Sequence, residues 1–184
     1  MTRVFQLGIA SIFSLFLSAC VSQEGHKTFD SHEAAKARIE LGLGYLSQHD
    51  FARAKQNFDK ALSHAPNYYL SHAVLAYLYQ KQGHLDLARH AYEKAIKLDK
   101  NQGDVLNNYG TFLCQQGEFE QAYKQFSQAL NAPHYYQHAD TYENLVWCAS
   151  FAKDAVRYQQ NLQHLTQFDP NRAKNFRHIL SNSG

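Results

Sequence analysis

The sequence is poor in the residues that interrupt regular structure, with 3 prolines and 9 glycines among 184 residues. A β-sandwich or barrel needs a turn about every 8–12 residues, built largely from Gly, Pro, Asn and Asp, so this scarcity argues against both folds. Hydrophobic residues make up 45% and charged residues 18% of the chain, a composition too apolar for intrinsic disorder. The composition therefore predicts one or two helical domains.

Two further patterns are missing: a run of charges of one sign and a closely spaced pair of cysteines. The formal net charge is +2, and no block of Lys or Arg forms the basic stripe that follows phosphates. The 3 cysteines include no Cys-x-x-Cys pair, which excludes by pattern a four-ligand structural zinc site and a thioredoxin-type centre. We therefore expect no nucleic-acid partner and no cysteine-based metal site.

The amino terminus has the pattern of an export signal. Arg3 precedes an uncharged stretch over residues 4–19, which is shorter than the about twenty apolar residues that a spanning helix needs. Residues 17–20 (Leu-Ser-Ala-Cys) resemble the bacterial lipobox. That resemblance implies cleavage before Cys20 and a lipid on its thiol. The alternative is an ordinary secretory signal in which Cys20 is incidental.

From this pattern we expect residues 1–19 to be a lipoprotein signal peptide and residues 20–32 to be a lipidated tether. Each buried methylene of an acyl chain contributes about 0.8 kcal/mol, and more than one chain anchors a protein stably without a transmembrane helix. By the sorting rule of Gram-negative lipoproteins, Val21 in place of Asp after Cys20 predicts the outer membrane, facing the periplasm.

The rest of the chain repeats itself every 34 residues. The recurring residues are Ala54, Ala88 and Ala122; Phe58, Tyr92 and Phe126; and Ala61, Ala95 and Ala129. These offsets match the tetratricopeptide pattern, in which each unit is a pair of antiparallel helices. The small residues let helices approach closely, and the aromatic rings fill wider gaps. Gly83 and Gly117, with His49 in the first unit, mark the turns within the pairs.

We therefore predict an all-α superhelix of four tetratricopeptide repeats over residues 33–184, with a short C-terminal capping helix. The expected repeats are 35–68, 69–102, 103–136 and 139–172, and the cap is 173–184. The first helix should begin near Asp30, which forms a capping pattern with Glu33, or at Ser31 as the alternative cap.

The fourth repeat departs from the pattern. Tyr158 and Leu165 stand where small alanines are expected, so its helices are expected to be displaced. Pro66, Pro133 and Pro170 are expected to close three of the units, because proline cannot continue a helix.

Eleven histidines raise the alternative of an enzyme or a metal site. His134 and His138 stand four residues apart, as two ligands on one helical face do, but Pro133 weakens that helix and no His-Glu-x-x-His pattern is present. Most other histidines and carboxylates fall on turns and outer helix faces. We therefore expect no enzyme, no metal, no cofactor and no small-molecule substrate.

Cys114 and Cys148 are one repeat length apart, which places them on the first helices of the third and fourth repeats. Consecutive first helices are neighbours, and export makes a disulfide chemically available. We predict that these two cysteines form a disulfide. The alternative is a pair of buried thiols that act as small hydrophobic residues.

In stacked repeats the first helices form an inner wall, which is the usual place for a bound peptide. The repeat offsets predict that this wall includes Ile39, Leu43, Leu46, Ala73, Tyr77, Gln80, Asn107, Thr111, Glu143, Trp147 and Phe151. Tyr77 and Trp147 are the expected anchors, because aromatic residues dominate interface energetics. The alternative is that Trp147 and Phe151 belong to the core of the irregular repeat.

Three segments and the lipobox together resemble the type IV pilus pilotins, the PilF/PilW proteins. The segments are residues 38–43 (Arg-Ile-Glu-Leu-Gly-Leu), 74–80 (Val-Leu-Ala-Tyr-Leu-Tyr-Gln) and 103–114 (Gly-Asp-Val-Leu-Asn-Asn-Tyr-Gly-Thr-Phe-Leu-Cys). The third segment is the most specific, because generic repeats do not share it. The resemblance covers residues from about 17 to 171, and pilotins typically have about six repeats rather than four.

The resemblance implies an outer-membrane lipoprotein that binds the pilus secretin subunit and helps it to reach the membrane and assemble into a ring. Two rival functions stay open. One is a lipoprotein scaffold for another envelope, cell-wall or β-barrel assembly complex. The other is an enzyme that uses a histidine site.

Overall fold

The computed structural model describes residues 30–181, with side chains to residue 176, and this part of the chain consists of helices without strands. The helices are α1 (Ser31–Ser47), α2 (Phe51–His64), α3 (Tyr69–Lys81), α4 (Leu85–Leu98), α5 (Gly103–Gln115), α6 (Phe119–Leu130), α7 (His138–Phe151), α8 (Ala155–Phe168) and α9 (Pro170–Ser181). None of them has the length and hydropathy that crossing a bilayer requires. The predicted signal peptide, Cys20 and the tether up to residue 29 lie outside the described residues.

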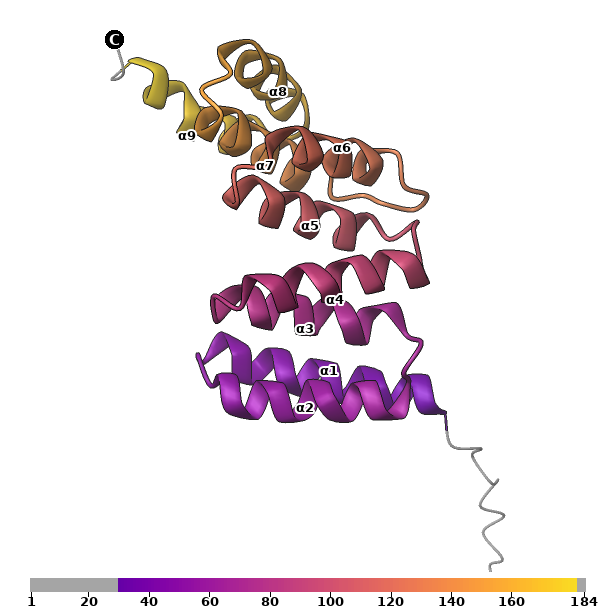
Figure 1. The fold of residues 1–184 in the computed structure, drawn as a ribbon. Helices are drawn as coiled ribbons and strands as arrows, with labels where there is room; N and C mark the ends of the chain where they lie inside the picture. Colours follow the sequence, from indigo (N-terminus) through magenta and orange to yellow (C-terminus); the bar gives the residue numbers. More distant parts are fainter. Residues whose placement is uncertain (1–29, 182–184) are drawn as a thin grey trace, which may run out of the picture.

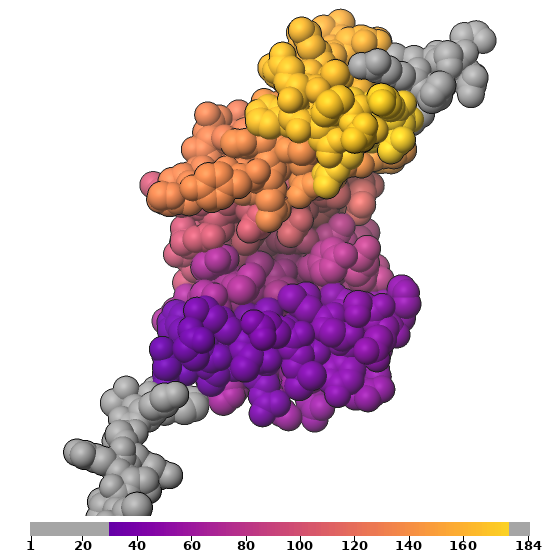
Figure 2. Space-filling view, turned by 180° about the vertical axis from the view of Figure 1, so that it is seen from behind, coloured from indigo at the N-terminus to yellow at the C-terminus, as the bar shows by residue number. Residues whose placement is uncertain are grey.

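The helices pair as antiparallel hairpins that stack in chain order (Figure 1). The hairpins are α1–α2, α3–α4, α5–α6 and α7–α8, and α9 packs against α8 at the C-terminal end. Seen from behind, the chain lies in successive bands from the N-terminal to the C-terminal repeat (Figure 2). The prediction of an all-α tetratricopeptide repeat superhelix with a C-terminal helix is confirmed.

Helix α1 begins at Ser31 because the side chain of Asp30 caps it. One carboxylate oxygen of Asp30 accepts hydrogen bonds from the backbone N–H groups of His32, at 2.9 Å, and Glu33, at 3.2 Å. Helical structure therefore starts within the segment 20–32 that was predicted to be a tether. Residues 31 and 32, the last two of the predicted tether, belong to α1.

The turn inside each hairpin contains one residue in the left-handed conformation. Gly83 (φ 76°) and Gly117 (φ 79°) fill this position in the second and third hairpins, as the sequence predicts. His49 (φ 59°) fills it in the first hairpin and Lys153 (φ 55°) in the fourth. Lys153 was not foreseen, because nothing in a lysine side chain marks it for this conformation.

Inside the hairpins, a residue without a bulky side chain on one helix faces an aromatic ring on the other. A Cβ atom at Gly42 of α1 would lie 2.4 Å from Cε1 of Phe58 in α2. At Gly110 of α5 it would lie 2.8 Å from the ring of Phe126 in α6. Both rings are fully buried. The helices of the first and third hairpins can therefore be this close only because these positions carry no side chain.

The fourth hairpin fills its core differently and depends on α9. Tyr158, which replaces the usual alanine, is buried, and its hydroxyl donates a hydrogen bond to the backbone carbonyl of Phe176 at 2.8 Å. Val146, Leu165 and Phe176 pack in the same cluster. The larger side chains on α8 are thus accommodated because α9 covers them.

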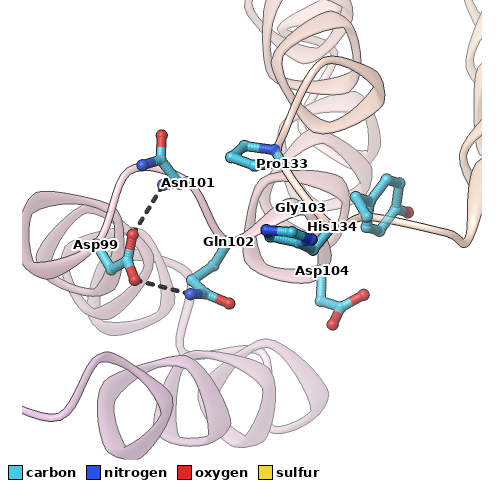
Figure 3. Close-up of a pocket in the computed structure, with 8 residues that line it drawn as sticks. Asp99, Asn101, Gln102, Gly103, Asp104, Pro133 and His134 are labelled. Carbon is cyan, nitrogen blue, oxygen red and sulfur yellow. Dashed lines mark hydrogen bonds between the residues drawn. The ribbon is translucent and has the colours of Figure 1, made fainter.

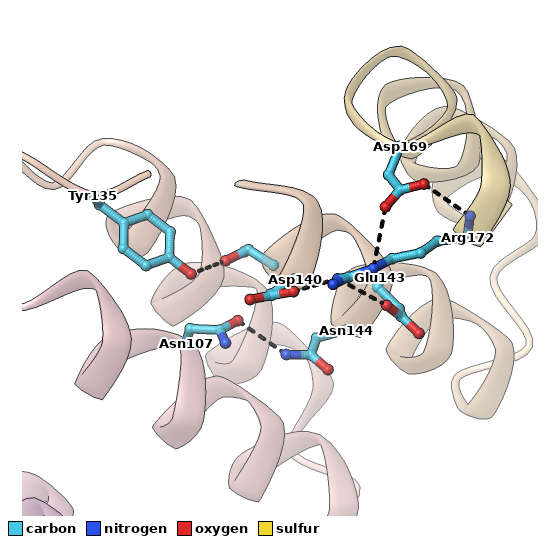
Figure 4. A network of polar contacts seen from close by, with 8 residues as sticks. Asn107, Tyr135, Asp140, Glu143, Asn144, Asp169 and Arg172 are labelled. Carbon is cyan, nitrogen blue, oxygen red and sulfur yellow. Dashed lines mark hydrogen bonds and ion pairs between the residues drawn. The ribbon is translucent and has the colours of Figure 1, made fainter. Parts of the chain in front are cut away.

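Pro170 opens α9 and does not close the fourth repeat, so the cap begins three residues before the predicted 173. Proline suits the first position of a helix, where its missing N–H is not needed. Asp169 caps this helix by accepting from the N–H groups of Asn171 and Arg172, both at 3.0 Å. The guanidinium of Arg172 then pairs with Asp140 on α7, which fixes α9 against that helix (Figure 4).

Replacing Gly42 by Ala should lower the free energy of unfolding by about 1–3 kcal/mol, because the added methyl group overlaps the buried Phe58 ring. Gly44, two residues along the same helix, is the matched control, since a Cβ there meets nothing within 4 Å. Gly44→Ala should raise the free energy of unfolding by about 0.5–1 kcal/mol through helix propensity. Urea unfolding followed by circular dichroism measures both changes. Effects of the same sign would contradict this packing.

Candidate functional site

The first helices of consecutive hairpins lie side by side, α1 with α3, α3 with α5, and α5 with α7. Together they form a surface that we call the first-helix face. Its residues are Leu43, Tyr77, Gln80, Lys81, Thr111, Gln115, Asn144, Trp147 and Phe151. Two pockets open on this surface, one in each half of the stack.

The first of these, the N-terminal pocket, has a volume of about 280 Å³. It is lined by Leu43, Leu46, Ser47, His49, Phe51, Tyr77 and Lys81. Leu43 is 41% exposed and Tyr77 is 36% exposed, so two large apolar side chains face solvent here. The ammonium of Lys81 lies 5.1 Å from the centre of the Tyr77 ring, as in a cation–π contact. The pocket is therefore apolar with one cation at its edge.

The second, the disulfide pocket, has a volume of about 310 Å³. It is lined by Thr111, Cys114, Gln115, Asn144, Trp147, Cys148 and Phe151. Cys114 and Cys148 are bonded to each other, with 5.7 Å between their Cα atoms, which links α5 to α7. Trp147 is 41% exposed and Phe151 is 59% exposed. These two residues are surface aromatics rather than core of the irregular repeat.

A chain of hydrogen bonds fixes the surface between the two pockets. The hydroxyl of Tyr92 donates to Oε1 of Gln80 at 2.8 Å, and Nε2 of Gln80 donates to Oε1 of Gln115 at 2.9 Å. Burial raises the pKa of Tyr92, so its hydroxyl stays a neutral donor. Gln80 is thereby held by two partners, and it joins the buried part of the second hairpin to the rim of the disulfide pocket.

Some residues predicted for the wall are buried or are held by neighbouring side chains. Ile39 is 3% exposed and packs in the core of the first two hairpins, so its assignment to the wall is wrong. Asn107 is 6% exposed, and its Oδ1 accepts from Nδ2 of Asn144 at 3.1 Å (Figure 4). Ala73 packs against the central core, and Glu143 pairs with Arg172 at 3.3 Å.

The remaining predicted residues come together as expected from the repeat offsets. Leu43, Leu46 and Tyr77 meet in the N-terminal pocket, although only an edge of Leu46 is accessible. Thr111 and Trp147 meet in the disulfide pocket, and Gln80 lies between the two. Repeat arithmetic alone thus assembles most of the site.

Three pocket residues were missed although a signal for them exists. Ser47, Lys81 and Gln115 follow one another at intervals of 34 residues, one position after Leu46, Gln80 and Cys114. Ser47 and Lys81 line the N-terminal pocket and Gln115 lines the disulfide pocket. Extending the predicted wall by this one position in each repeat would have identified all three residues.

A third pocket, of about 390 Å³, lies away from this face between the loops before α5 and α7 (Figure 3). Asp99 there accepts hydrogen bonds from the N–H of Asn101 at 2.9 Å and from Nε2 of Gln102 at 2.7 Å. Burial raises the pKa of the neighbouring Asp104. This pocket is polar, and the carboxylate of Asp99 is occupied with the loop itself.

The two histidines singled out in the sequence do not share one helical face, because α7 begins only at His138. His134 lies in the loop with φ 59°, and the ring of His138 packs against Tyr135 and Phe168. Within the part of the chain that the structure describes, no three His, Cys, Asp or Glu side chains are placed to hold one metal ion.

Comparison with protein families identifies tetratricopeptide repeats at residues 69–102 and 91–124. The first of these ranges is the second repeat predicted from the sequence. An uncharacterised protein of Haemophilus influenzae is 52% identical over 167 residues, which cover 91% of this chain and 93% of the other.

The chain is also similar to two type IV pilus proteins. The type IV pilus assembly protein PilF of Pseudomonas aeruginosa is 36% identical over 138 residues, covering 73% of this chain and 55% of PilF. The solved structure of P. aeruginosa PilF superposes with a TM-score of 0.73 at 28% identity, covering 84% of this chain and 78% of that one. PilW, a widely conserved type IV pilus biogenesis factor, has a TM-score of 0.71 at 22% identity, covering 76% and 64%. The likeness to PilW concerns the fold alone.

The disulfide should contribute about 3–4 kcal/mol to the free energy of unfolding, because it closes a long loop in the unfolded chain. Cys114→Ala combined with Cys148→Ala should lower the free energy of unfolding by that amount in urea titrations without reductant. Dithiothreitol should lower the free energy of unfolding of the wild type to that of the variant and should leave that of the variant unchanged. If the unfolding midpoint of the wild type did not change with dithiothreitol, the presence of the disulfide would be contradicted.

Proposed function

The chain belongs to the tetratricopeptide repeat family that includes the Haemophilus influenzae protein and, more distantly, PilF, and we propose that it is a protein-binding adaptor in type IV pilus biogenesis. Tetratricopeptide proteins are typically scaffolds without catalysis, and the proposal involves no chemical step. Its partner is another polypeptide, held on the first-helix face.

The observation that carries this proposal is the pair of apolar pockets on one continuous face. Exposed aromatic side chains set in pockets are the usual anchors of protein interfaces. Tyr77 and Trp147 occupy such positions in different hairpins, and the hydrogen bonds of Gln80 hold the surface between them. A single extended or helical segment that crosses the first helices can use both pockets.

The finer proposal is that the partner is the type IV pilus secretin subunit and that the adaptor is anchored in the outer membrane through a lipid on Cys20. The support is the resemblance of residues 17–20 to the lipobox and of residues 103–114 to pilotins. The lipid fixes where the complex forms, and the first-helix face selects what is bound.

Removing the Tyr77 ring should weaken secretin binding about tenfold, equivalent to about 1.4 kcal/mol, because the N-terminal pocket loses its aromatic anchor. Cells that carry Tyr77→Ala should show fewer heat-resistant secretin multimers on immunoblots. Tyr136→Ala is the matched control, since Tyr136 is 82% exposed on the loop before α7 and lies outside both pockets. Normal multimers with Tyr77→Ala would sink the proposed site, and normal multimers after deletion of the whole protein would favour another envelope complex.

Replacing Cys20 by Ser should abolish lipidation and move the protein out of the outer-membrane fraction, because a serine hydroxyl cannot form the thioether. Membrane fractionation and the mass of the purified protein measure the two effects. Ser22→Ala, two residues away, should change neither. An unmodified wild-type chain would rule out the anchor.

A further inference from the structure

The disulfide pocket differs from the N-terminal pocket in carrying no charge. None of its seven lining residues is ionisable at neutral pH, since Cys114 and Cys148 are bonded. The N-terminal pocket contains Lys81 and His49, and Lys81 forms no ion pair within the described residues. A charged side chain would therefore find no partner in the disulfide pocket and would lose its hydration there.

The aromatic wall of the disulfide pocket is fixed from several sides. Trp147 directly precedes Cys148, which is fully buried and bonded to Cys114 of α5. The indole ring lies 6.2 Å from the ring of Phe151, nearly parallel to it, and 4.9 Å from the ring of Phe176, at 71° to it. Phe176 is itself held by the hydrogen bond from Tyr158. The bond between α5 and α7 therefore sets the distance between the aromatic wall and Thr111.

The rim of the pocket offers the hydrogen-bonding groups that a peptide bond requires. Gln115 uses its Oε1 to accept from Gln80, and its Nε2 has no partner within the described residues. Asn144 uses its Nδ2 to donate to Asn107, and its Oδ1 has no partner there. An amide NH2 group and an amide oxygen thus remain at the rim, and they can pair with the C=O and the N–H of a residue in a bound polypeptide.

We propose that the disulfide pocket takes one bulky uncharged side chain, aromatic or branched aliphatic, of the bound polypeptide, and that the Cys114–Cys148 bond positions this pocket. The inference rests on the proposed function and adds to it the chemistry of the second anchor. The volume of the disulfide pocket, about 310 Å³, accommodates one such side chain. Partner binding then depends on the oxidised state of the protein.

Trp147 makes the proposal measurable, because it is the only tryptophan in the chain. The probes are fluorescently labelled overlapping 15-residue peptides that cover the secretin subunit, together with the intact subunit, titrated into the full-length oxidised protein. The binding peptide should shift Trp147 emission to shorter wavelength. Replacing one bulky apolar residue of that peptide by Ala or by Asp should weaken binding at least tenfold.

Two changes to the protein test the wall and the bond separately. Phe151→Ala should weaken binding of the same peptide about tenfold. Phe168, which is 52% exposed and lies outside the pocket, gives the matched control: Phe168→Ala should change binding less than twofold. Cys114→Ala with Cys148→Ala should weaken binding at least fivefold, and reducing the wild type should do the same. Circular dichroism at the assay temperature shows whether each variant is folded.

The outcomes separate this inference from the proposed function. A peptide that binds without moving Trp147 emission, and equally well to Phe151→Ala and to reduced protein, would overturn the second anchor and leave the adaptor role standing. Failure of every peptide and of the intact subunit to bind would remove the adaptor role and the anchor with it. A concentration-dependent dimer that shifts Trp147 emission without peptide would assign the pocket to a second copy, against the proposal.

Discussion

The architecture depends on the close approach of the two helices in each hairpin. Gly42 and Gly110 let the rings of Phe58 and Phe126 lie directly on the facing backbone, and buried alanines at 54, 88 and 122 keep the second helices equally close. Because each ring fills the space that a missing side chain leaves, the hairpins are dense enough to stack on one another. The fourth hairpin lacks this arrangement and needs α9, through Tyr158 and Phe176, to complete its core.

The first-helix face is a consequence of this stacking. Once the first helices lie side by side, large apolar side chains that the core covers only in part, such as Leu43, Tyr77 and Trp147, stay exposed along them. Polar bonds and one covalent bond then fix that face: Gln80 to Tyr92 and Gln115, Asn107 to Asn144, and Cys114 to Cys148. The proposed partner would therefore meet a face whose aromatic side chains are already positioned, which would lower the entropic cost of binding.

The sequence was sufficient for the repeated part of the molecule and insufficient where the repeat breaks down. Ala and aromatic positions 34 residues apart predict the hairpins, the turns at Gly83 and Gly117, and the meeting of Cys114 with Cys148. Periodicity assigns a residue to one side of a helix but does not give the depth at which it sits. Ile39 and Asn107 were for this reason placed on the wall although neighbouring helices bury them. The prediction for Pro170 was wrong because proline is common both after the end of a helix and at its first position. Here Asp169 caps the helix that follows, so Pro170 begins a helix.

The central claim is that the first helices, rather than the second helices or the loops, hold the partner. Hydrogen–deuterium exchange of the full-length protein with and without the secretin subunit tests it most directly. We expect slower exchange only in peptides that contain Leu43, Tyr77, Gln115 and Trp147. Protection of α2, α4 and α6, with α1, α3, α5 and α7 unchanged, would contradict it.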